Sequence, residues 1–191
     1  MEKSQDEGRQ RIIAHTRAWV DRAVIGLNLC PFARAAQTAG RVRYELSEAR
    51  DPGGLLDDLG AAIATLASTD PEDIETTLLI APWTLGDFLE FNDFLDPAEA
   101  LLERMGMLGK LQIASFHPDY RFADTDPDDI GNATNRSPYP VLHLLRESSI
   151  GRAIEAGADS DAIVARNLRT LEELGPQGWA RIVAACRADA G

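Results

Sequence analysis

Residues 110–147 read KLQIASFHPDYRFADTDPDDIGNATNRSPYPVLHLLRE, a stretch that holds both a core strand and the longest irregular segment of the chain. Its first residues alternate between two faces, which predicts a β-strand over about 110–116. The strand must stop at Pro118, because proline has no backbone N–H to donate to a sheet ladder. About twenty residues without helical or strand periodicity follow, up to a helix that we expect to begin near Pro140.

A compact domain rarely keeps so long an irregular loop unless the loop is functional or disordered. This loop contains Tyr120, Phe122 and Ile130, and it balances its acids with arginines, unlike a solvated tail. We therefore expect an ordered loop laid over the end of the sheet. In open α/β sheets ligands collect at the carboxyl ends of strands, so the loop is also the predicted functional site.

Strand patterns and helix patterns alternate along the rest of the chain. Strands are predicted at about 41–46, 76–81 and 110–116. Helices are predicted at about 9–27, 32–39, 52–66, 85–95, 97–105, 140–156, 160–174 and 176–188. This order predicts an α/β fold with a small, mostly parallel sheet of three strands or slightly more, covered by helices, and a helical C-terminal third. An α+β sandwich with some antiparallel pairing is the alternative.

The size and charge of the chain limit its function. Residues 1–191 fit a single globular domain. A net charge of −12 argues against nucleic-acid and anionic-membrane partners, both of which favour a basic face, but local arginines still allow a small anion. The N-terminal residues lack the apolar core of a signal peptide, and two cysteines make no disulfide framework. We expect a cytoplasmic protein with reduced thiols.

His117 is the strongest single candidate, since it stands where the strand meets the loop. An imidazole there titrates near neutral pH and would serve as an acid, a base or a metal ligand. The alternative is a histidine that only bonds the loop to the sheet. His143 has two similar interpretations: it points toward the loop or covers the core.

Two arginines, Arg121 and Arg136, bracket the loop, with Asn132 and Asn135 between them. A guanidinium offers a planar fork that matches a carboxylate or a phosphate. The alternative is internal: five aspartates of the loop would pair with the arginines and hold the loop together.

Acidic residues at 124, 126 and 128 have the odd-position spacing of a calcium-binding loop, but Asp129 and Asn135 replace the glycine and glutamate that such a loop needs. A Mg²⁺ or Mn²⁺ site using His117, Asp119 and one of these acids is a further alternative. Asp-Pro-Asp-Asp is more often a turn and helix cap, so we predict no metal. No cofactor motif is present, and the cofactor stays unknown.

Cys30 precedes Pro31, which is suited to be the first residue of a short helix. As the N-cap of that helix, Cys30 would face unpaired N–H groups that favour its thiolate. The alternative is a small buried hydrophobe. Three large apolar side chains flank it: Leu27, Leu29 and Phe32. Cys186 lies on an apolar helical stripe and is expected in the core, while His15 is expected at the surface.

Three motifs together resemble a known family: LNLCPFA (27–33), FHPDYRF (116–122) and NRSPYPVLHLLRE (135–147). The resemblance is to the domain of unknown function 1415 family of bacteria and plants, and it covers most of the chain. It implies a single-domain soluble protein and carries over no activity, substrate or cofactor.

We therefore predict an enzyme that acts on a small anionic metabolite at the 117–147 loop, with His117 as acid/base. The other candidate catalytic residues are Asp119 and Cys30, and the candidate binding residues are Arg121, Asn132, Asn135, Arg136, Tyr139 and His143. The alternatives are a non-catalytic module for small anions, in which His117 is dispensable, and a scaffold whose acidic surface meets a protein partner.

Overall fold

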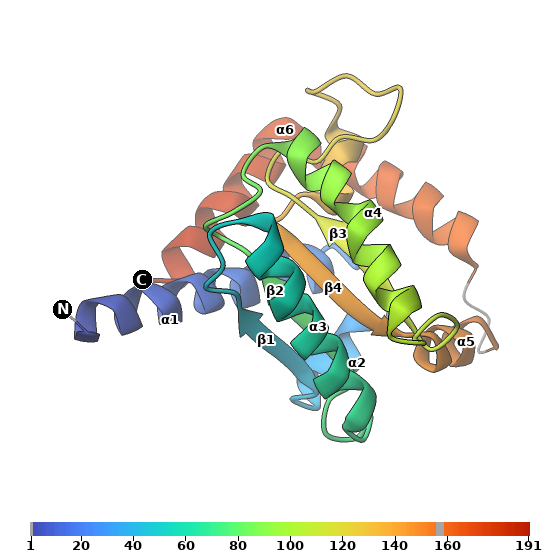
Figure 1. Ribbon diagram of the computed structural model, residues 1–191. Coiled ribbons are helices and arrows are strands. Elements are labelled where there is room, and N and C mark those ends of the chain that lie inside the picture. Colours follow the sequence, from blue (N-terminus) through green and yellow to red (C-terminus); the bar gives the residue numbers. More distant parts are fainter. Residues whose placement is uncertain (1, 156–158) are drawn as a thin grey trace.

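A computed structural model describes residues 2–155 and 159–191. Its centre is a four-stranded mixed sheet with the order β1-β2-β4-β3 (Figure 1). The strands are β1 Val42–Leu46, β2 Thr76–Ile80, β3 Leu111–Phe116 and β4 Val141–Arg146. β1 and β2 are parallel, while β4 is antiparallel to both β2 and β3. β1, β2 and β3 therefore end, and β4 begins, at the same end of the sheet.

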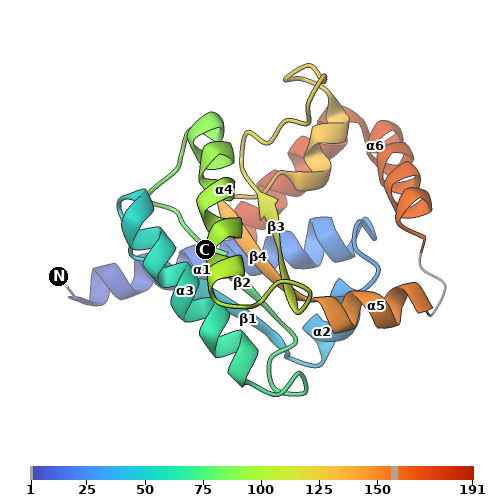
Figure 2. The same ribbon diagram turned by 45° about the vertical axis from the view of Figure 1, so that its right-hand side comes forward.

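Helices cover both faces of this sheet (Figures 1 and 2). They are α1 Glu2–Trp19, the π-helix η1 Val20–Ile25, α2 Ala33–Thr38, α3 Pro52–Ser68, α4 Phe88–Arg104, the 3-10 helix η2 Ile130–Asn135, α5 Glu147–Glu155 and α6 Ser160–Asp189. α3 and α4 pack on one face, and α1, η1 and the C-terminal half of α6 pack on the other. No helix in the described parts of the chain is long and apolar enough to cross a membrane.

Strand alternation divides the core in two. Leu79 of β2 packs with α3 and α4, whereas its neighbours Leu78 and Ile80 pack with α1 and α6. This is the two-residue period of a pleated strand with both faces covered. The strand predicted at about 76–81 is confirmed as β2, and every residue of it is buried, as in a strand covered on both faces.

The largest correction concerns residues 140–156, where a helix was predicted. Val141–Arg146 is a strand, and the helix begins only at Glu147. The predicted α/β fold with helices over the sheet is confirmed. The mostly parallel sheet of three strands or slightly more is corrected to a mixed sheet of four strands, because the inserted strand β4 runs antiparallel to its neighbours. A short apolar run does not reveal its period, and pairing with β2 on one side and β3 on the other selects the extended form.

The pair of helices predicted at 85–95 and 97–105 is also wrong, because α4 runs through Pro97 without a break. Asp87 caps its first turn by accepting hydrogen bonds from the N–H groups of Leu89 and Glu90. Proline removes one helical hydrogen bond, but burial of the apolar face on both sides of it keeps the helix whole. The buried residues of that face are Phe91, Phe94, Ala98 and Leu102.

Two glycines give a matched test of the helical framework. Gly175 divides α6 with φ 65° and ψ 172°, a region that is almost restricted to glycine, and a methyl group there would meet no neighbouring atom. We expect Gly175→Ala to lower the free energy of unfolding by about 1–3 kcal/mol through backbone strain alone. Gly60→Ala, within α3 and with ordinary contact at 3.7 Å, should raise it by about 0.5–1 kcal/mol. Urea denaturation measures both, and equal effects would contradict the assignment of strain to Gly175.

Candidate functional site

His117 lies at the end of β3, fully buried. Its Nδ1 accepts a hydrogen bond from the backbone N–H of Asp119 at 3.0 Å, and its Nε2 lies 3.1 Å from the carbonyl oxygen of Leu85. Because Nδ1 is the acceptor, the ring proton is on Nε2 and is donated to that carbonyl. The ring also packs against Phe88 and Phe91, and burial lowers its pKa. This geometry favours the structural alternative over proton transfer by His117.

The two asparagines brace the loop. The Asn132 side chain accepts from the Phe122 N–H and the Thr125 hydroxyl, and it donates to the carbonyl of Asp126, at 2.9–3.0 Å. The amide of Asn135 donates to a carbonyl near the end of β3 at 3.0 Å. The loop is thus ordered, as predicted, and these amides hold it to itself and to the sheet.

The arginines do not form the internal Arg–Asp pairs that were the alternative to ligand binding. Arg136 donates instead to the backbone carbonyls of Tyr120 (3.3 Å) and Pro127 (2.6 Å). Arg121 is exposed, and neither arginine has a carboxylate partner within residues 2–155 and 159–191. Of the acids, Asp129 is the N-cap of η2, accepting from the N–H of Gly131 at 2.7 Å, as a turn-and-cap role requires.

Cys30 is not a helix cap. α2 begins at Ala33, its N-cap is Phe32, and no side chain caps it, so the dipole argument for a reactive Cys30 is wrong. Cys30 is half-buried, and no described hydrogen bond links it to His117 or Asp119. Within the described residues no cluster of three or more His, Cys, Asp or Glu side chains is arranged to hold a metal ion.

His143 belongs to the sheet rather than to the loop. Its Nε2 lies 2.7 Å from the hydroxyl of Thr76, which itself donates to the carbonyl of Leu144. Burial lowers the pKa of His143 to about 4, so the ring is neutral near pH 7.

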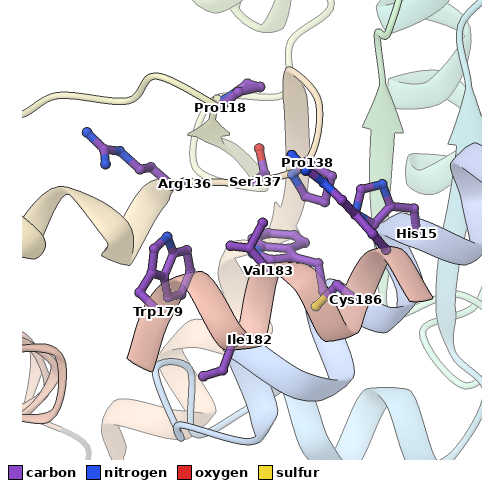
Figure 3. A pocket seen from close by; sticks show the side chains of 11 residues that line it. His15, Pro118, Arg136, Ser137, Pro138, Trp179, Ile182, Val183 and Cys186 are labelled. Carbon is purple, nitrogen blue, oxygen red and sulfur yellow. The ribbon is translucent and has the colours of Figure 1, made fainter. Parts of the chain in front are cut away.

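A groove of about 220 Å³ lies where the segment before β4 faces α1 and the C-terminal half of α6 (Figure 3). In Figure 3, α6 forms one wall with Trp179, Val183 and Cys186, and His15 stands at one end. The lining residues are His15, Trp19, Pro118, Arg136, Ser137, Pro138, Trp179, Ile182, Val183, Cys186 and Arg187. Pro118, Arg136, Ser137 and Pro138 of the loop line part of the groove, but most of its wall comes from helices far away in the sequence.

The groove is basic and apolar. Nδ1 of His15 lies 3.2 Å from the hydroxyl of Tyr139, with the rings edge to face. Burial, and secondarily the charge of Arg187, lowers the pKa of His15. Burial raises the pKa of Tyr139, opposed by Arg187 and Arg11. None of the lining residues is acidic, although the chain carries a net charge of −12.

A family model described as "Protein of unknown function (DUF1415)" matches residues 11–181. The chain belongs to the DUF1415 family. The resemblance predicted from the three motifs is therefore confirmed. No curated protein and no solved structure matches the chain. The family match includes His15, Arg136 and Trp179 of the groove and ends before Cys186 and Arg187.

Three groove residues of this DUF1415 protein were not predicted as site residues: His15, Trp179 and Arg187. His15 was expected at the surface, yet it is half-buried against Tyr139. Cys186 is buried as predicted, but it also lines the groove. The apolar stripe of α6 was visible as a helical period, whereas its position opposite α1 and the segment before β4 follows only from folding.

The three histidines of this DUF1415 protein should make its stability depend on pH. All three folded pKa values are lowered from 6.5, most strongly for His143, so the unfolded chain takes up protons first as the pH falls. We expect the free energy of unfolding to be retained above pH 6.5 and to decline between pH 6.5 and about 4. His143→Gln should reduce that slope by about 1.4 kcal/mol per pH unit, the contribution of one proton. Urea titrations at pH 7, 6 and 5 measure it, and identical slopes would refute the assignment.

The two thiols should differ in reactivity. Cys186 is 2% exposed and burial raises its pKa, whereas Cys30 is half-buried in a loop. We expect iodoacetamide to alkylate Cys30 of native DUF1415 protein well before Cys186 at pH 7.5, and both equally in urea. Peptide mass spectrometry over time reports each site, with Cys30→Ser as the control. Earlier alkylation of Cys186 would contradict its burial and show that the α6 wall of the groove is open to the reagent.

Proposed function

We propose that this protein binds a small molecule with an apolar body and an anionic group, in the groove between α1, α6 and the segment before β4. The observation that carries the proposal is an apolar groove with Arg187 and His15 at its wall and without an acidic lining residue, in a strongly acidic chain. Apolar pockets with a few convergent polar groups are the usual form of small-molecule sites.

The apolar part of the ligand would rest on Trp179 and Val183, which are four residues apart and therefore on one face of α6. Pro118 and Pro138 approach from the opposite wall. Trp179 offers a broad flat surface, so a ring is the shape that this wall fits best. A volume of about 220 Å³ is below the range of drug-sized ligands and indicates a metabolite-sized molecule.

The anionic part would meet Arg187. This guanidinium has no ion-pair partner in the described part of the chain, and its charge acts on both His15 and Tyr139. An arginine without a carboxylate keeps its planar fork available for a ligand oxygen. Arg136 contributes its stem to the groove, because its guanidinium donates to two loop carbonyls.

The second candidate function is an enzyme that uses the same groove. It is favoured by the hydrogen-bonded pair of His15 and Tyr139, two titratable groups whose pKa values burial moves in opposite directions. Such pairs can pass a proton to or from a bound ligand. The predicted acid/base role moves in this hypothesis from His117 to His15.

Benzoate and its neutral analogue benzamide test the binding proposal, since they share a ring and differ in charge. We expect benzoate to shift the indole N–H signals of Trp19 and Trp179 in NMR spectra, and to bind at least about tenfold more tightly than benzamide. Arg187→Gln should weaken benzoate by about tenfold, or about 1.4 kcal/mol, without changing benzamide.

Arg181→Gln is the matched control, because Arg181 is exposed on the same helix, lies outside the groove lining and carries the same charge. Equal binding of benzoate and benzamide, or equal losses in Arg187→Gln and Arg181→Gln, would contradict the proposal.

A further inference from the structure

We propose that the anionic group taken by the groove is a doubly charged phosphoryl group, as in a small phosphate monoester, held between Arg11 of α1 and Arg187 of α6. This inference rests on the proposed function and adds the chemical class of the ligand.

Arg11 and Arg187 belong to the two helices that meet at the His15 end of the groove; Arg187 lines the groove, and Arg11 lies outside its lining. Arg11 precedes His15 by four residues, so the two side chains lie one turn apart on one face of α1. Arg187 and His15 both line the groove, and α1 and α6 pack against each other through Trp19 and Cys186. The hydroxyl of Tyr139 is 3.2 Å from the His15 ring, which places it at this same end of the groove.

Two neighbouring arginines are already paired with carboxylates. Arg9 of α1 pairs with Glu48, and Arg22 pairs with Asp189 near the end of α6. Neither Arg11 nor Arg187 has a carboxylate partner in the described parts of the chain. Burial raises the pKa of Tyr139, and the charges of Arg187 and Arg11 both oppose that rise.

Two permanent positive charges match a dianion. Arginine stays protonated at any physiological pH, so the charge at this end of the groove is fixed. A carboxylate would neutralise only one guanidinium, whereas a phosphate monoester carries about −1.5 to −2 charges at pH 7 and three terminal oxygens. Two guanidinium forks supply donors from two helices, and the hydrogen-bonded pair of Tyr139 and neutral His15 leaves one further proton free to donate.

Phenyl phosphate, benzoate and benzamide test this inference, because they present the same ring with different charges. At pH 7.5 and constant ionic strength we expect phenyl phosphate to bind at least about tenfold more tightly than benzoate. Arg11→Gln should weaken phenyl phosphate by about tenfold and benzoate by less than about threefold, while Arg187→Gln weakens both. Arg11→Lys should restore part of the phosphate affinity, since it keeps the charge and loses the fork. Arg181→Gln remains the control for net charge, and isothermal titration calorimetry reads every dissociation constant.

The outcomes separate the two proposals. If benzoate binds as tightly as phenyl phosphate and both bind more tightly than benzamide, the phosphoryl inference fails and the proposed function stands. If phenyl phosphate binds more tightly but Arg11→Gln and Arg181→Gln weaken it equally, the assignment to Arg11 fails. If neither anion binds more tightly than benzamide, both proposals fail. Thermal melting of each variant without ligand verifies that the variant is folded.

Discussion

The structure depends on one strand placed against the direction of its neighbours. β4 lies between β2 and β3 and is antiparallel to both, so its backbone groups are hydrogen-bonded on each side. A buried backbone group without a partner is costly, and a central strand satisfies its groups only when both ladders form. The insertion also gives β4 two covered faces, since Val141 packs toward α1 and α6 while Leu142 packs toward α3 and α4.

This insertion explains why the loop before β4 is long and ordered. β3 ends at the same end of the sheet where β4 begins, and the loop between them covers that end. His117 and Asn135 connect the two ends of the loop: the His117 N–H donates to the carbonyl of Asn135, whose amide donates to the carbonyl of Ser115. Asn132 closes the loop on itself. His117, Asn132 and Asn135, which were predicted as site residues, therefore stabilise the loop that forms one side of the groove.

The groove follows from that frame. Pro140 immediately precedes β4, so the start of the strand holds residues 136–139 near α6 and α1. The apolar face of α6, with Arg187 near its end, therefore lines a groove beside this segment. The basic end is local: the whole chain carries a net charge of −12, and Asp189 at the end of α6 is paired with Arg22. Under the proposed function, this local positive potential would attract a small anion, while the net negative charge would repel large polyanions.

The sequence alone determined the elements whose signals are local. The strands at β2 and β3, the start of α3 at Pro52 and the division of the C-terminal helices between residues 174 and 176 each depend on neighbouring residues, and each was predicted close to its observed place. An ordered loop at the end of β3 could also be predicted from its composition. Arg136 and Tyr139 of that loop do lie at or beside the groove.

Tertiary structure decided the rest. Residues 141–146 are apolar enough for a helix or a strand, and only their pairing with β2 and β3 selects the strand. Cys30 is not the predicted helix cap, because the chain turns before α2 begins at Ala33. Side chains of α6 hold this turn by donating to the carbonyls of Asn28 and Leu29. His15 and Arg187 are separated by more than 170 residues, and no local pattern relates them. They line the same groove because α1 and α6 bury their apolar faces on the same side of the sheet. This contact is driven by the burial of side chains and cannot be read from the spacing of residues in the sequence.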